Sequence, residues 1–221
     1  LVGSEMCIRD RYLACGFYLM YPGDDVINAY LPGMGTTWGI SLAGLTANYD
    51  LGYSDAADFF FQVVFVATAM SIVSGAVAER MRLVPFFIFA VVMTGFIYPV
   101  QGYWKWGGGW LDAIGYTDFA GSGVVHLCGA SAALAAVLIL GARAGKYGSD
   151  GSVTVMRGSN IPIAALGAFI LWLGWFGFNG GSQLAVHTVD NANAVAQVFL
   201  NTNAAAAGGA VSYTHLRAHE T

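Results

Sequence analysis

The chain has 221 residues, of which 57% are hydrophobic and only 10% are charged, whereas an ordinary soluble domain carries about 25% charged residues. This balance excludes a water-soluble globule and, with 14% aromatic residues and a net charge of −4, also a disordered chain. Nine Lys and Arg against 13 Asp and Glu, and three cysteines, provide no basic surface for nucleic acid, no disulfide framework and no metal-ligand spacing. We therefore expect an integral membrane protein without a metal or cofactor.

Four long apolar stretches predict membrane-spanning helices, since about 20 helical residues cross a bilayer. They are Asp58–Ala78, Leu83–Trp104, Ser122–Ala142 and Ile161–Gly181. Before them, Tyr12–Tyr21 looks like the end of a further span, and after them a fifth span begins near Ala192 and is interrupted near Val211. None of these stretches alternates with the period of a strand. The predicted fold class is all-α, a polytopic transmembrane helical bundle.

Basic residues gather in two loops between the spans, and this sets an orientation. They are Arg80, Arg82, Arg143, Lys146 and Arg157. The alternate loops contain Lys105 as their one basic residue, together with many acidic residues. The positive-inside rule places the two basic loops in the cytoplasm, and it places the segment 22–58 and the loops near Trp106 and His187 outside.

The two ends of the chain differ in character from the sequence between them. Residues 1–11 (LVGSEMCIRDR) and 212–221 (SYTHLRAHET) are polar and charged, and Arg217 would lie at an unfavourable depth in the membrane. Both strings resemble translated sequencing-adapter read-through. We therefore expect two non-native tails, residues 1–11 and 212–221, around a membrane domain that occupies residues 12–211.

Two ionisable residues stand out around the third span. His126 follows Asp118 by eight residues, which is about 12 Å at the rise of an α-helix. A buried histidine can simply pair with a neighbouring helix, but ionisable residues inside spans are functional candidates by default, and a neutral imidazole both donates and accepts a hydrogen bond. Asp118 directly precedes the span. It could cap the helix, stabilise a cation at the outer mouth, or do both.

Aromatic residues provide a second signal at the predicted outer side. Phe65 lies in the first full span, Trp106 in an outer loop, and Phe178 with Ser182 near the outer end of the fourth span. Aromatic residues gather at membrane interfaces in any case. However, the orientation brings these four residues and Asp118 to one side of the membrane, where aromatic faces, a hydroxyl and a carboxylate form a plausible site for a small cation.

Patterns typical of enzymes are absent from the sequence. There is no Ser-His-Asp arrangement, no pair of carboxylates and no metal cluster, and Gly107–Gly109 lacks the Lys-Ser/Thr that follows in a phosphate-binding loop. We therefore expect a protein that is not an enzyme.

Three separated motifs, in the correct order, resemble those of the ammonium transporters of the Amt/Mep/Rh family. They are Ser74–Arg80 (SGAVAER), Asp118–His126 (DFAGSGVVH) and Gly174–Ser182 (GWFGFNGGS). A further short stretch, Trp106–Gly109 (WGGG), falls at the expected place, and the contexts of Trp106 and Phe178 resemble the Amt branch more than the Rh branch. One departure is Ser122, which stands where glycine is usual.

The resemblance implies a role for each of these site residues. Phe65, Trp106 and Ser182 would bind ammonium at the outer side, with Asp118 supporting the site electrostatically. Phe65 and Phe178 would stack as a gate below it. His126 would be the first of two histidines lining an apolar pore, and the second is expected beyond the end of this sequence.

The resemblance also implies an architecture and partners. We expect part of an eleven-span fold with an inverted repeat, with the first span and half of the second missing from this sequence. We also expect a homotrimer in the plasma or inner membrane, ammonium or ammonia as the substrate, and a PII-type regulatory protein at the cytoplasmic face. An alternative function is an ammonium sensor coupled to a cytoplasmic signalling module.

Overall fold

The computed structural model describes residues 12–24, 26–33, 47–48, 53–156 and 158–218. Within these residues, four helical stretches are long and apolar enough to cross a membrane. They are Ala56–Val77, Leu83–Ala113, Ser122–Leu140 and Ile161–Gly181. This confirms the predicted spans and the all-α fold class. The chain divides into two compact units, Leu1–Val155 and Met156–Thr221.

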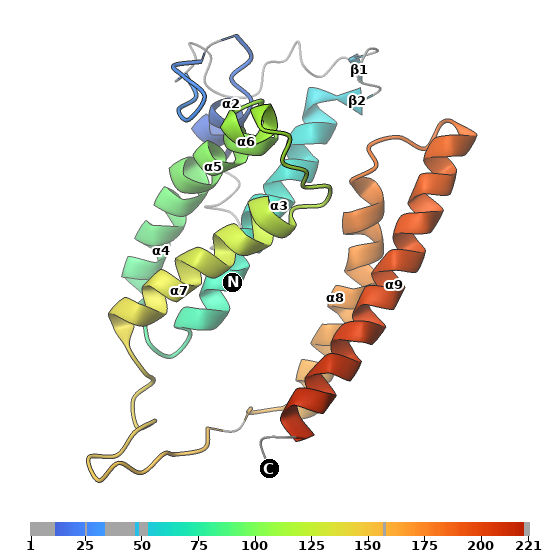
Figure 1. Ribbon diagram of the computed structural model, residues 1–221. Helices are drawn as coiled ribbons and strands as arrows, with labels where there is room; N and C mark the ends of the chain where they lie inside the picture. The colour runs from blue at the N-terminus through green and yellow to red at the C-terminus, as the bar shows by residue number, and fades with distance from the viewer. Residues whose placement is uncertain (1–11, 25, 34–46, 49–52, 157, 219–221) are drawn as a thin grey trace. The chain divides into compact units, whose positions relative to one another are not determined.

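The first unit contains nine helical segments and a small hairpin among its described residues (Figure 1). In chain order the segments are η1 (Tyr12–Gly16), α2 (Phe17–Met20), β1 (Ala47–Asn48), β2 (Tyr53–Ser54), α3 (Asp55–Val77), α4 (Leu83–Val92), η3 (Met93–Ile97), α5 (Tyr98–Lys105), α6 (Trp110–Ala113), η4 (Ser122–Leu127) and α7 (Cys128–Leu140). The segments labelled η are π-helical, with a widened turn that often occurs at functional sites. The two strands are antiparallel, with Ala47 opposite Ser54, and lie outside the spans.

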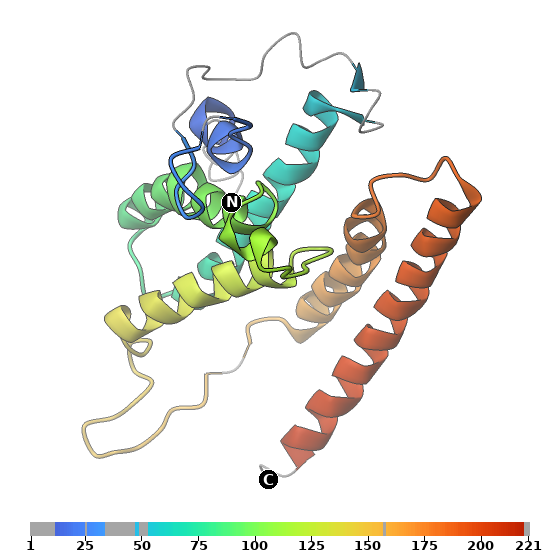
Figure 2. The same cartoon turned by 45° about the horizontal axis from the view of Figure 1, so that its top comes forward.

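Helix α3 contributes much of the core of the first unit, and α7 lies across it in both views (Figures 1 and 2). The buried residues of α3 recur at helical spacing and include Val66, Ala69, Met70 and Val73. The two helices approach closely at Gly129, where a Cβ would lie 2.7 Å from the carbonyl oxygen of Ala69. Small residues permit such close packing between membrane helices.

The two loops that we predict to be cytoplasmic, one after α3 and one after α7, contact each other at one end of the first unit. The Arg80 guanidinium donates to the carbonyl of Gly141 at 2.9 Å, and Arg143 lies 3.3 Å from the carboxylate of Glu79. Each arginine therefore bridges the ends of α3 and α7. Both basic loops lie at the same end of the unit, which agrees with the predicted alternation of the spans.

The second unit is a pair of helices, α8 (Ile161–Gly181) and α9 (Val189–Ala218), that pack against each other. Asn160 caps α8 by accepting from the backbone N–H of Ile163, and Pro162 lies in the first turn, where a helix needs no N–H donor. Helix α9 begins three residues before the predicted start of the fifth span and continues through residue 212. The foreign origin of residues 212–221 stays a prediction, because a helical backbone does not test it.

Candidate functional site

Asp118 caps the start of the third span with both carboxylate oxygens. Oδ1 accepts from the backbone N–H groups of Gly121 and Ser122 at 2.8 and 2.9 Å. Oδ2 accepts from those of Gly123 and Val124 at 2.9 and 2.7 Å. The first N–H groups of a helix lack partners within the helix, and here one buried side chain provides acceptors for four of them. The capping interpretation of Asp118 is therefore correct.

This cap depends on glycine at two positions. Gly121 has φ +94, and a Cβ there would contact the Val125 side chain and lie 3.2 Å from Cη2 of Trp106. At Gly123 a Cβ would collide with the hydroxyl of Tyr116. Ser122 uses its backbone N–H, so the serine in place of the usual glycine leaves the bond to Asp118 intact.

Trp106 is attached to the same turn by its indole, and it lies against Phe65. Its Nε1 donates to the backbone carbonyl of Asp118 at 3.1 Å. The ring centroids of Phe65 and Trp106 are 6.0 Å apart, and Phe61 contacts Phe65 edge to face at 4.5 Å. Phe65 is only 2% exposed, whereas Trp106 is half-buried. The structure therefore brings three predicted site residues together, with Trp106 as the accessible ring and Phe65 behind it.

His126 lies on the π-helical segment η4, close to this cluster. Its Nδ1 is 3.3 Å from the carbonyl oxygen of Gly121, which also accepts from the backbone N–H groups of Val125 and His126. The helix begins at Ser122 and Asp118 lies beside its first turn, so the 12 Å rise calculated for eight helical residues does not apply to this segment. The imidazole is half-buried within the first unit.

Phe178 and Ser182 belong to the second unit. Ser182 follows the last turn of α8, where its hydroxyl donates to the carbonyl of Phe178 at 2.9 Å. Nearby, the Asn179 amide donates to the Thr202 hydroxyl at 3.0 Å and Gly180 lies against the ring of Phe199, which joins α8 to α9. The predicted stack of Phe65 on Phe178 involves both units and stays a prediction.

Sequence reasoning missed two residues that contact the segment Asp118–His126. Gln101 donates from Nε2 to the carbonyl of Val124 at 2.7 Å, and Tyr116 packs against Gly123. The signal for Gln101 was present, because an amide within an apolar span needs a hydrogen-bond partner. The signal for Tyr116 was absent, because aromatic residues near a membrane surface are common.

The arrangement offers a half-buried indole face near the Asp118 carboxylate that caps the start of the helix. An aromatic face attracts a small cation without a full opposite charge, which permits binding that is readily reversed. Among the described residues, no group of three His, Cys, Asp or Glu side chains is placed to hold a metal ion.

Comparisons with known proteins agree on one family. A model of the Ammonium Transporter Family matches residues 7–221. A putative ammonium transporter of Synechocystis is 43% identical over 203 residues, which are 91% of this chain and 44% of that protein. Ammonium transporter Amt2 of Archaeoglobus fulgidus is 44% identical over 211 residues, which cover 91% of this chain and 42% of that protein.

A solved structure gives the same result for the fold. The crystal structure of Candida albicans Mep2 superposes with a TM-score of 0.70 at 29% identity, covering 82% of this chain and 39% of that one. The chain thus spans less than half the length of the relatives that it matches.

Proposed function

Because the chain belongs to the ammonium transporter family, we propose that the whole protein carries ammonium or ammonia across a membrane. The observation that supports this most is the outer aromatic pair, in which the half-buried Trp106 is attached to the Asp118 turn and lies against buried Phe65. Transfer of a cation from water into hydrocarbon costs far more free energy than transfer of a neutral molecule. A site that binds ammonium and releases neutral ammonia below it fits this restriction.

In this proposal, Trp106 and Ser182 bind the cation. The indole face attracts ammonium. The Ser182 hydroxyl donates its hydrogen bond to the Phe178 carbonyl, so its oxygen can accept from an ammonium N–H. Asp118 already accepts four backbone N–H groups, so it acts by its charge and by fixing Trp106.

The path below this site follows from the same proposal. Phe65 and Phe178 stack as a gate that ammonium reaches before it loses its proton. Ammonia then passes His126, whose neutral imidazole donates a hydrogen bond from one ring nitrogen and accepts one at the other. The residues present fit passage of a small polar solute. The proton that ammonium loses passes to water at the outer side or crosses the membrane separately from ammonia.

Assembly, location and partners belong to the proposal as well. The whole protein is a multi-pass protein of the plasma or inner membrane and a homotrimer, and it is a transporter without enzyme activity. A PII-type protein binds its cytoplasmic face, at the end that carries Arg80 and Arg143.

Uptake of labelled methylammonium tests this function. The full-length gene is expressed in a cell that lacks its own ammonium transporters, and we expect saturable uptake that ammonium inhibits. Removal of the indole in Trp106→Leu raises KM by about five- to thirty-fold, since a cation–π contact contributes roughly 1–2 kcal/mol. Trp104→Leu, two residues earlier on α5, is the matched control and leaves KM unchanged. Uptake no greater than in cells without the gene contradicts the proposal.

A further inference from the structure

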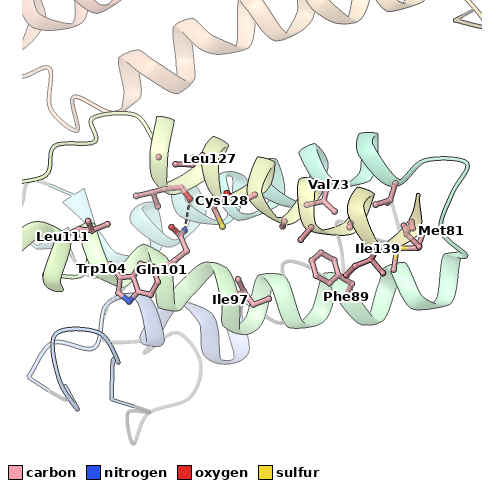
Figure 3. A pocket seen from close by; sticks show the side chains of 18 of the residues that line it. Val73, Met81, Phe89, Ile97, Gln101, Trp104, Leu111, Leu127, Cys128 and Ile139 are labelled. Atoms are coloured by element: carbon pink, nitrogen blue, oxygen red, sulfur yellow. Dashed lines mark hydrogen bonds between the residues drawn. The ribbon is translucent and has the colours of Figure 1, made fainter. Parts of the chain in front are cut away.

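Gln101 is an amide in an apolar groove. A groove of about 810 Å³ runs between α4–α5 and α7, and most side chains that line it are apolar, including Phe89, Ile97, Leu127 and Ile139 (Figure 3). An amide in such surroundings costs free energy unless it is hydrogen-bonded. Gln101 donates from Nε2 to the backbone carbonyl of Val124 at 2.7 Å, the dashed line at Gln101 in Figure 3.

The carbonyl of Val124 is available because the helix widens at this point. In a regular α-helix it would accept from the backbone N–H of Cys128, four residues later. Here that N–H donates to the carbonyls of Gly123 and Val125 instead. Gln101 thus supplies a donor from a neighbouring helix where the regular bond is replaced, within the π-helical segment η4.

Helix α5 and the Trp106 that follows it hold the segment Asp118–His126 at two points. Trp106 donates to the carbonyl of Asp118 at 3.1 Å, and Gln101 donates to that of Val124. Val124 and Val125 are both buried, and His126 comes next in the chain. Rotation of the widened turn about its axis would therefore break the Gln101 bond and turn the imidazole together with the backbone.

We propose that Gln101 is a positioning residue for His126, holding the Val124 carbonyl so that the widened turn presents the imidazole to the transport path. This proposal rests on the proposed function for its consequence in transport, but not for the geometry itself. Because Gln101 acts through the Val124 carbonyl and not at Trp106, its loss should affect passage of the solute rather than its recruitment at Trp106.

The test uses Gln101→Met in the full-length protein, because the methionine side chain matches the length of glutamine but has no N–H donor. Tyr103→Phe is the matched control. It lies on the same helix and removes a bond of the same type, from the Tyr103 hydroxyl to the carbonyl of Asn28 at 3.0 Å. Gln101→Met should lower the maximal rate of methylammonium uptake about two- to ten-fold, because this range corresponds to the net contribution of one hydrogen bond. The KM should be unchanged. Tyr103→Phe keeps the parental maximal rate.

A spectroscopic readout separates this proposal from the proposed function. In protein labelled with ¹⁵N-histidine, the His126 ring resonances are assigned with His126→Asn. We expect Gln101→Met to shift them and Tyr103→Phe to leave them unchanged, whether or not the parent protein carries methylammonium. If Gln101→Met does not assemble, Gln101→Asn, which is one methylene shorter, is measured in the same way with the same expectation. Unshifted resonances, or equal shifts in the Tyr103→Phe control, overturn the positioning role.

Discussion

Helices α3 and α8 have the same hydropathy but different surroundings. Each contains a membrane-spanning stretch of mean hydropathy 1.9, yet 44% of that window is buried in α3 and none in α8. On α3, Val66, Met70 and Val73 pack inside the first unit. On α8, Leu166, Ile170 and Leu173 are exposed. Within this chain, hydropathy identifies both spans, whereas the side-chain contacts distinguish the more buried α3 from the less buried α8.

The difference extends to how each helix pair is attached. The first unit combines a close backbone approach at Gly129 with polar anchors at both ends, at Asp118 and at Arg143. The second unit has mainly the Asn179–Thr202 bond and ring contacts at Phe199. We therefore expect substitutions at these points of the first unit to cost more stability than comparable changes in the second.

The largest effect is expected from Asp118→Ala. This change leaves four backbone N–H groups at the start of the third span without their acceptor, and each buried unsatisfied group costs about 1–3 kcal/mol. The full-length protein should lose most of its assembled form after extraction into detergent, measured by size-exclusion chromatography. Asp112→Asn is the control, because that exposed carboxylate only pairs with Lys105, and such pairs contribute about 0–1 kcal/mol. Equal assembly of the two variants would contradict the importance of the cap.

A smaller effect is expected from Gly129→Ala. The new Cβ would lie 2.7 Å from the Ala69 carbonyl, so α3 and α7 must separate, at a cost of about 1–3 kcal/mol. Gly177→Ala on α8 is the matched change, since no described atom lies within 4 Å of its Cβ position. Thermal unfolding should show a lowered Tm for Gly129→Ala only. An equal loss at Gly177 would show that α8 has a close partner at this position as well, which would remove the contrast between the two glycines.

Thr202→Val tests the polar bond of the second unit. It removes the hydroxyl that accepts from Asn179 while keeping the shape of the side chain. Hydrogen bonds between membrane helices contribute about 0.6 kcal/mol on average, so we expect a drop in Tm smaller than that of Gly129→Ala. Asn201→Ala, at an exposed neighbouring position, serves as the reference. A drop as large as that of Gly129→Ala would contradict the ranking of the two units.

The smallest effect concerns Asp150, which lies outside the spans. The hydroxyl of Ser152 donates to its carboxylate at 2.6 Å and lowers the pKa of Asp150 below its ordinary value. A lowered pKa favours the folded loop above the ordinary pKa, and this contribution disappears as the pH falls through the folded value. Ser152→Ala should raise the pKa of Asp150 in an NMR titration of labelled protein without changing the Tm. An unchanged pKa would contradict the bond.

Much of the fold was predictable from sequence, because long apolar stretches and the positions of prolines are local features. The gathering of Phe65, Trp106 and Asp118 at one end of the first unit was also predictable, from loop charges and from the family motifs. The widened turns η3 and η4 were not, because they depend on tertiary contacts. The bond from Gln101 to Val124 joins residues 23 positions apart, and the bridge from Arg143 to Glu79 depends on how α3 packs on α7. The sequence position of Asp118 did not decide whether it caps the helix. Its four hydrogen bonds from backbone N–H groups show that it does.

The most direct test of the account is whether His126 lines the transport path. The full-length His126→Asp variant is reconstituted into vesicles, with protein amount and oligomeric assembly checked first, and ammonium-evoked current and potassium flux are measured. A carboxylate at this position adds a negative charge, which attracts a cation but not neutral ammonia. We predict an increased current relative to uptake, or a potassium flux that the parent protein lacks. Unchanged selectivity in a well-assembled variant would contradict the account and leave His126 with a packing role.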